Sequence, residues 1–239
     1  MSLRYLYSTT DKNRRNSIIE YNGSTFSPLT NRPLAGYTSY TRFFGTSSEQ
    51  RQFVVKQPKL DSLKKDKLAA VISAYTKSYE LEQLVWNLLY PSQKAQLFTE
   101  GGPRLILPRL PGGTLSENLS ENPLTRCQQA FAVAYALQRL YELGWAHNDL
   151  NQDNVLIEQK SDGSFQAYLI DFDRASKIDE YNSNSDLLYL SSLVYVVPNL
   201  RRCGGYRCFD SFITDLLSEI NRLRELGQDT YAIRSGQKK

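Results

Sequence analysis

The sequence predicts an α+β fold with two lobes: a mostly antiparallel, β-rich lobe with one long helix over residues 1–108, and a mainly helical lobe over residues 109–239. Three observations favour this fold. The first half is rich in aromatic and β-branched residues broken by turn residues. The second half carries apolar residues at helical spacing. The composition changes near residues 108–113, where we place the boundary, and both lobes together are expected to act as one domain.

Each element of the first lobe follows from its own pattern. The segments 26–29, 32–44 and 51–58 are aromatic and β-branched, and they predict an antiparallel hairpin followed by a third strand. A helix is expected from Ser62 to Leu89, because apolar residues recur near every third or fourth position until Pro91 stops the pattern.

From Leu105 onward, the expected elements alternate with turn signals. Leu105–Leu107 predicts a short buried strand just before the boundary, and a long helix is expected from Pro123 to Leu143, with Gly144 just past its end. Two short strands, 155–158 and 167–170, are separated by a turn sequence, SDGS. The rest of the chain reads as helix, over 185–197 and 209–226.

Composition excludes several classes of protein. The net charge of +4 in 239 residues is too mild for a nucleic-acid-binding protein. Cys127, Cys203 and Cys208 are odd in number and widely spaced, which argues against a disulfide framework or a zinc site and favours a reducing compartment. No apolar run is long enough to span a membrane, and the N-terminus does not look like a signal peptide. We therefore expect a cytoplasmic protein, with secretion into a host cell as the alternative.

One stretch of the second lobe is crowded with short polar side chains. The sequence HNDLNQDNVLIE begins with His147, the only histidine, and packs two aspartates and three asparagines in front of an apolar strand. Asp171-Phe172-Asp173 directly follows the next strand. A surface loop would tolerate this composition, and the buried strand that follows does not require it. The stretch is therefore either a surface loop or a functional site.

Taken in order, the motifs resemble those of the protein-kinase-like superfamily. His147-x-Asp149-x-x-x-x-Asn154, followed by a strand, a turn, a strand and Asp171-Phe172-Asp173, is similar to its catalytic loop and metal-binding motif. FVVK, ending at Lys56, resembles its third-strand lysine motif, and ILPRLPGGTL resembles its hinge between lobes. The resemblance extends from about Leu34 to Val197.

The resemblance implies an ATP-dependent kinase that uses Mg²⁺. Phosphoryl transfer depends on positioning and charge neutralisation, and Mg²⁺ prefers oxygen ligands. Asp149 is then expected to accept or orient the proton of the attacking hydroxyl, and Asn154 and Asp171 to hold Mg²⁺ against the phosphates. His147 is expected to tie the loop to the Asp-Phe-Asp segment without taking part in the chemistry.

Lys56 is implied to bind the α- and β-phosphates and to pair with a glutamate of the long helix. Glu80 and Glu82 both qualify, and they point to different faces of a helix because they are two residues apart. Apolar residues follow Glu82 at offsets of three, four and seven, so we favour Glu82 and keep Glu80 as the alternative. A lysine that merely extends from an edge strand to solvent is the competing interpretation.

The remaining expected nucleotide contacts come from the hinge and from a glycine loop. Leu107 is in the gatekeeper position, and Pro108 would offer its carbonyl and Leu110 its amide to adenine, although a plain turn between lobes would have the same composition. Gly36 is the one glycine in a loop where the usual pattern has three.

Farther along, Asp186 is expected to support the backbone of the catalytic loop. The alternative is that Ser185 is the N-cap of a helix and Asp186 is an acidic residue in its first turn.

Four departures from the usual pattern bear on the acceptor and on regulation. Asn148 replaces an arginine, Asn151 a lysine common in serine/threonine kinases, and Asp173 a glycine. Residues 174–184 are too few for a full activation segment. We therefore expect no control by a phosphorylated loop, and either basal activity or activation by a protein partner that steadies the helix carrying Glu82.

Two groups of small bacterial kinases share these features. The first expectation is a minimal serine/threonine protein kinase of the effector type, and the alternative is a sugar kinase similar to the 3-deoxy-manno-octulosonic acid kinases of lipopolysaccharide, whose catalytic loop and DFD motif look alike. A pseudokinase that only binds a partner is the third hypothesis, and the presence of Lys56, Asp149, Asn154 and Asp171 argues against it.

Overall fold

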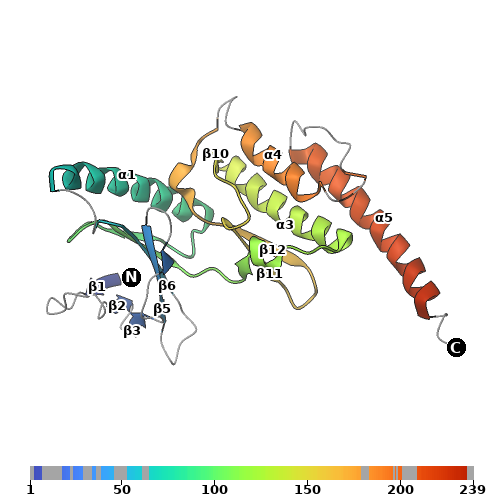
Figure 1. Ribbon diagram of the computed structural model, residues 1–239, viewed down its shortest axis with the longest axis horizontal. Coiled ribbons are helices and arrows are strands. Elements are labelled where there is room, and N and C mark those ends of the chain that lie inside the picture. Colours follow the sequence, from blue (N-terminus) through green and yellow to red (C-terminus); the bar gives the residue numbers. More distant parts are fainter. Residues whose placement is uncertain are drawn as a thin grey trace. The chain divides into compact units, whose positions relative to one another are not determined.

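The structure is a computed structural model that describes residues 3–6, 18–21, 24–28, 34–35, 39–45, 53–60, 65–178, 183–195, 197, 199–200 and 209–235 (Figure 1). The chain divides into two compact units, Met1–Arg109 and Leu110–Lys239. The first unit is built on an antiparallel sheet, and the second is mainly helical. The expected α+β class is therefore confirmed.

An antiparallel sheet forms the framework of the first unit. Its strand order is β1-β2-β3-β5-β6-β8-β7, and β4 pairs with β5 beside this path. Its strands are β1 (Leu3–Leu6), β2 (Ile18–Tyr21), β3 (Ser24–Pro28), β4 (Leu34–Ala35), β5 (Ser39–Gly45), β6 (Phe53–Pro58), β7 (Gln96–Phe98) and β8 (Arg104–Pro108). The sequence predicted strands that overlap β3, β4, β5, β6 and β8. It did not predict β1, β2 and β7, which are short and lie near the two edges of the sheet.

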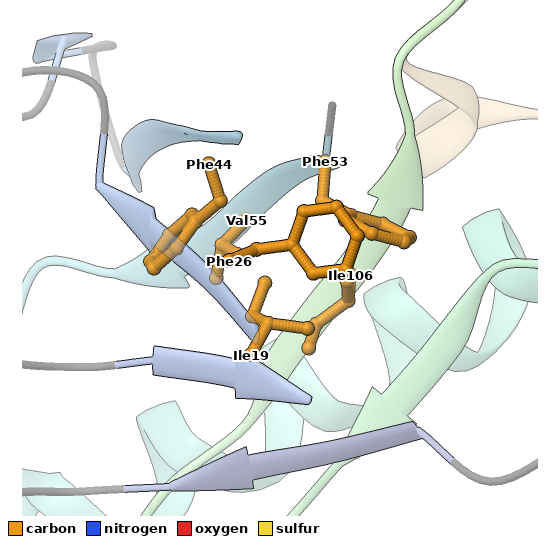
Figure 2. Packing of buried hydrophobic residues seen from close by; sticks show 6 residues of the cluster. All are labelled: Ile19, Phe26, Phe44, Phe53, Val55 and Ile106. Carbon is orange, nitrogen blue, oxygen red and sulfur yellow. The ribbon is translucent and has the colours of Figure 1, made fainter. Parts of the chain in front are cut away.

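One face of this sheet carries the hydrophobic core of the unit. Figure 2 shows six side chains from β2, β3, β5, β6 and β8 that meet there: Ile19, Phe26, Phe44, Phe53, Val55 and Ile106. The rings of Phe26 and Phe53 pack edge to face, with their centroids 4.8 Å apart. Because side chains alternate along a strand, Lys56 points to the face opposite Val55.

The helix α1 (Lys65–Leu89) packs on the face of the sheet that carries Lys56, because its residue Glu82 contacts that lysine. The apolar stripe of the helix includes Val85, Trp86 and Leu89, and all three residues are buried. Its C-terminal end is fixed by the Trp86 indole, which donates to the carbonyl of Gln93 at 2.6 Å. The helix ends where Pro91 was expected to stop it.

A central helix, α3 (Pro123–Glu142), organises the second unit. Asn122 caps its first turn by accepting from the amide of Thr125 at 3.1 Å, and Gly144, with φ of 79°, turns the chain after its end. Figure 1 shows α4 (Ser183–Leu193) and α5 (Phe209–Ser235) running beside α3, and both contact it. The apolar face of α3 is buried among these neighbours.

The opposite side of α3 packs on the hairpin of β11 (Val155–Gln159) and β12 (Phe165–Leu169), which β9 (Gly113–Thr114) extends to three strands. The short helix α2 (Leu115–Asn118) follows β9. A second small ladder joins β10 (Trp145–Ala146) to β13 (Ser176–Lys177), and a 3-10 helix, η1 (Phe172–Arg174), precedes β13. Among the helices of the described residues, none combines the length and the apolar character needed to cross a membrane.

Candidate active site

In the first unit, Lys56 and Glu82 form a close ion pair. The Lys56 ammonium on β6 lies 2.6 Å from Glu82 Oε1 on α1. Glu82 is completely buried, and the side chain of Lys56 is 14% exposed. Glu80 lies on the exposed side of the same helix. The prediction that Lys56 pairs with Glu82, and not with Glu80, is confirmed, and the alternative of a lysine extending to solvent is wrong.

The other residues expected to contact the nucleotide lie at the ends of the two units. Leu107 is buried near the end of β8, and Pro108 is the last residue of that strand, opposite Phe53. Leu110, the first residue of the second unit, is buried. Gly36 lies outside the described residues. Contacts of these residues with adenine or phosphate therefore stay predictions.

In the second unit, residues 147–154 form a loop between β10 and β11 whose start is anchored by one buried carboxylate. Asp186 of α4 accepts from the His147 amide at 2.8 Å and from the Asn148 amide at 3.1 Å. The hydroxyl of Tyr141 donates to the same carboxylate at 3.3 Å. Burial raises the pKa of Asp186, and the bond from the His147 amide is the largest effect opposing that rise. The predicted support of the loop by Asp186 is confirmed, whereas Ser185 is no N-cap because α4 begins at Ser183.

His147 connects this loop to the strand that precedes Asp171. Its Nε2 lies 3.0 Å from the carbonyl oxygen of Ile170, and its ring centroid is 5.3 Å from that of Phe172. A carbonyl can only accept, so Nε2 carries the proton and Nδ1 does not. Burial lowers the pKa of His147, which favours this neutral form. The side chain is fully buried, and the prediction that it ties two segments together is confirmed.

The register of the β11–β12 hairpin brings Asn154 and Asp171 to the same end of the hairpin. Val155 pairs with Leu169, and the amide of Ile170 donates to the carbonyl of Asn154 at 3.0 Å. Asn154 and Asp171 therefore flank one pair of strands. The amide group of the Asn154 side chain donates to the Asp149 carbonyl at 2.9 Å, which leaves its oxygen for a cation.

Two backbone conformations in this region are uncommon. Within the described residues, Asn148 (φ 63°) and Asp171 (φ 68°) are the non-glycine residues with positive φ. Such conformations cost on the order of 1–3 kcal/mol each and cluster at functional sites. At Asn148, two side-chain hydrogen bonds offset this conformational cost. The side-chain amide donates to the carbonyl of Arg174 at 3.0 Å and to the Ser176 hydroxyl at 2.9 Å. The loop and the segment after Asp171 are thus fixed to one another.

Asp149 is the most accessible of the candidate groups in this loop. Its side chain is 35% exposed, and its Oδ1 lies 3.5 Å from Nη1 of Arg174. Sequence reasoning did not select Arg174, and the signal that could have found it is a basic residue three positions after Asp171. Nearby, the Ser116 hydroxyl donates to Asp153 at 2.5 Å and links α2 to the loop.

The oxygen ligands offered here suit Mg²⁺ that is shared with phosphate groups. Among the described residues, no group of three or more histidine, cysteine, aspartate or glutamate side chains could hold a metal by itself. Mg²⁺ bound to nucleotides normally takes only one or two protein ligands and completes its shell with phosphate and water. The Asn154 amide oxygen and the Asp171 carboxylate fit that pattern.

The buried ion pair between a strand lysine and a helix glutamate in the first unit is typical of the protein-kinase-like class. The anchored HxD loop and the aspartate after the following hairpin in the second unit are typical of the same class. Comparison with known families agrees: residues 116–195 match the model of the lipopolysaccharide kinase (Kdo/WaaP) family. This stretch includes the loop, Asp171 and Asp186. No curated protein matches the chain. The predicted resemblance is confirmed, and the match supports a kinase, that is, an ATP-dependent phosphotransferase.

Proposed function

We propose that this protein transfers the γ-phosphate of ATP to a hydroxyl group of a lipopolysaccharide sugar. The observation that carries the proposal is the anchored loop 147–154 with Asp171, which falls inside the stretch matched by the lipopolysaccharide kinase family model. That match favours the sugar-kinase alternative over the serine/threonine protein kinase that the sequence first suggested. An ATP-dependent enzyme also suits the cytoplasmic location expected from the cysteine content.

The proposed roles of the second-unit residues follow from their chemistry. Asp149 accepts or orients the proton of the sugar hydroxyl, because its carboxylate is accessible and its backbone is fixed by Asn154 and Asn151. Asn154 and Asp171 hold Mg²⁺ against the phosphates. The ion, when bound, neutralises the charge that the phosphates develop. The roles of Asp149 and Asn154 explain part of the crowding of short polar side chains before β11.

The remaining proposed nucleotide contacts come from the first unit and from the hinge. Lys56 binds the α- and β-phosphates, with Glu82 fixing the direction of its side chain. The carbonyl of Pro108 and the amide of Leu110 bind adenine, and Gly36 is the remaining proposed phosphate contact. In the reaction, the sugar oxygen forms a bond to the γ-phosphorus while the bond from that phosphorus to the bridging oxygen of ADP breaks.

The test is ATP turnover with different acceptors side by side. We would measure ADP release with lipopolysaccharide that contains 3-deoxy-manno-octulosonic acid, with a mixture of generic protein substrates, and with water alone. The proposal expects stimulation by the sugar acceptor and labelled phosphate in the lipopolysaccharide fraction. Asp149→Asn keeps the size of the side chain, removes the base and should abolish the stimulation. Transfer to protein but not to sugar would instead establish the effector-kinase alternative.

A further inference from the structure

Arg174 is the cationic side chain that the structure places beside Asp149. Among the described residues, it is the only one within ion-pair distance of that carboxylate, at 3.5 Å. The side chain of Arg174 is 69% exposed, and no described residue forms a hydrogen bond with its Nε or Nη2. An exposed ion pair at this distance contributes little to stability. The contact with Asp149 therefore leaves the guanidinium available to a stronger anion.

The backbone that carries Arg174 is held in place independently of its side chain. Its carbonyl accepts from the side chain of Asn148, and the Ala175 amide donates to the Phe172 carbonyl at 3.1 Å. Phe172 and Ala175 are both buried. The starting point of the Arg174 side chain is thus fixed relative to the loop, and only the side chain itself has to move to meet a ligand.

The loop itself contributes no positive charge at this place. Asn151, two residues after Asp149, has both ends of its side chain engaged locally. Its amide group donates to the Asp149 carbonyl at 3.1 Å, and its oxygen accepts from the amides of Asp153 and Asn154 at 2.9 and 3.1 Å. Asn151 therefore shapes the turn and is not positioned to bind a phosphate.

We propose that Arg174 binds the phosphoryl group while it passes to the hydroxyl oriented by Asp149. This inference rests on the proposed function. An attacking hydroxyl must lie within about 3 Å of the Asp149 carboxylate. The guanidinium already contacts that same carboxylate, so the phosphorus attacked by this oxygen comes within reach of the Arg174 side chain.

The chemistry of arginine suits this role. The guanidinium is planar and permanently charged, and it can donate two parallel hydrogen bonds to phosphate oxygens. In the transition state, charge is spread over the three equatorial oxygens of the phosphoryl group, and an arginine that donates to these oxygens stabilises that state. The acceptor proton still goes to Asp149, and ADP still leaves with the bridging oxygen.

The experiment compares Arg174→Gln and Arg174→Lys with Arg139→Gln, a matched control at an exposed arginine of α3. The first readout is ATP hydrolysis with saturating Mg²⁺. Arg174→Gln should lower kcat by roughly 100-fold, in the range seen when one donor to a transition state is removed, and leave the KM for ATP nearly unchanged. Arg174→Lys should recover part of kcat because it keeps the charge without the planar pair of donors. Arg139→Gln should behave as wild type.

The second readout is binding measured by calorimetry. The probes are MgADP alone and MgADP with aluminium fluoride, which mimics the phosphoryl group in transit. Wild type should bind the fluoride complex at least about tenfold tighter than MgADP, as expected of a transition-state analogue. Arg174→Gln should bind MgADP as wild type does and lose that preference.

The possible outcomes separate the two proposals. An Arg174→Gln enzyme with the kcat and fluoride preference of the Arg139→Gln control overturns the role of Arg174 and leaves the proposed function intact. A higher kcat for Arg174→Gln also overturns this role, because it would mean that Arg174 blocks access to the Asp149 carboxylate. Wild type that neither binds MgADP nor hydrolyses ATP overturns the proposed function and this inference with it. Equal thermal unfolding curves for all variants are expected, since both arginines are exposed.

Discussion

At the scale of single residues, the second unit separates side chains that hold the loop from side chains that can react. His147 and Asp186 are fully buried and bond to backbone groups, whereas the Asp149 side chain is 35% exposed. Buried polar groups with bonded partners stabilise one conformation, and accessible carboxylates are available for chemistry. The short polar side chains around residue 150 thus serve two purposes: some hold the loop in one conformation, and others are available for chemistry.

Replacing Asp171 with alanine should remove one oxygen ligand of Mg²⁺ and abolish ATP turnover, by roughly 10²-fold or more, while the fold is retained. Turnover is measured by ADP release, and the fold by circular dichroism and thermal unfolding. Asp173→Ala is the matched control, because this exposed aspartate is two residues away and has no proposed role. Full activity of Asp171→Ala would show that the metal assignment is wrong.

Cys127 gives a prediction about pH. This thiol is buried in α3, and burial, with the charge of Glu219 as a second cause, raises its pKa from 9.0 to about 11. Between these values the thiol ionises in the unfolded chain and stays protonated in the folded one, so the free energy of unfolding falls as the pH rises from 9 to 11. At about 1.4 kcal/mol per pKa unit, the loss approaches about 2–3 kcal/mol.

The measurement is chemical denaturation of wild type and Cys127→Ala at pH 8 and at pH 10.5. Other groups titrate in this range, but they are common to both proteins, so the difference between the two isolates the thiol. Cys127→Ala should lose less stability on going to the higher pH. An equal loss in both proteins would mean that this thiol ionises as readily in the folded state.

At the scale of elements, the segment after Asp171 is held by contacts with the loop. The Asn148 side chain bonds to the Arg174 carbonyl and to the Ser176 hydroxyl, so one residue of the loop fixes η1 and the start of β13. The His147 ring packs on Phe172 of the same segment. Phosphorylation regulates such segments by ordering them, and this one already has its partners.

Activity should therefore not depend on phosphorylation. Protein expressed in bacteria and treated with phosphatase should retain its ATP turnover, or need only a protein partner that acts on α1. Asn148→Ala should lower turnover, because the two bonds are lost and the left-handed backbone at this position no longer has a side chain that stabilises it. Asn148→Gly, which tolerates the backbone angle, separates these two causes. Activity that disappears on dephosphorylation and returns with a phosphate on Ser176, or on Tyr181 outside the described residues, would contradict this.

The elements predicted from the sequence are those whose pattern is local. The loop, the hairpin and α3 could be predicted because turn residues, caps and alternation stand within a few positions of each other, as in the SDGS turn that sets the pairing of Val155 with Leu169. The strands β1 and β2 are four residues each and depend on their neighbours in the sheet, so their own sequences do not reveal them. The Asn148–Arg174 contact could not be predicted because it depends on a positive φ at an asparagine.

At the scale of the whole molecule, the residues proposed to act on one nucleotide are divided between two units. Lys56 and Glu82 belong to Met1–Arg109, and Asp149, Asn154 and Asp171 belong to Leu110–Lys239. The choice of Glu82 over Glu80 was predictable from the apolar offsets that follow it. The acceptor was not, because the same loop chemistry serves any hydroxyl, and the family match on residues 116–195 was needed to favour a sugar.

Lys56→Met should affect the molecule in two ways that can be separated. It removes the phosphate contact, so most ATP turnover is lost, and it leaves the buried Glu82 without this lysine, which destabilises the protein by up to about 3–5 kcal/mol. Adding Glu82→Gln removes the buried charge and should restore part of the stability but none of the turnover. The measurements are denaturant unfolding and ADP release. A double variant that regains turnover would show that Lys56 has only a structural role.

The single histidine makes the loop observable by magnetic resonance through one side chain. Because His147 is the only imidazole in the chain, every imidazole signal in the spectrum of the whole protein comes from this ring. Its Nε2 faces the Ile170 carbonyl, and its ring packs against Phe172, so those signals sense the ring current of that phenyl group and the length of that hydrogen bond. A nucleotide or acceptor that shifts the Asp-Phe-Asp segment will move this one set of signals, which makes His147 a built-in spectroscopic reporter of the site.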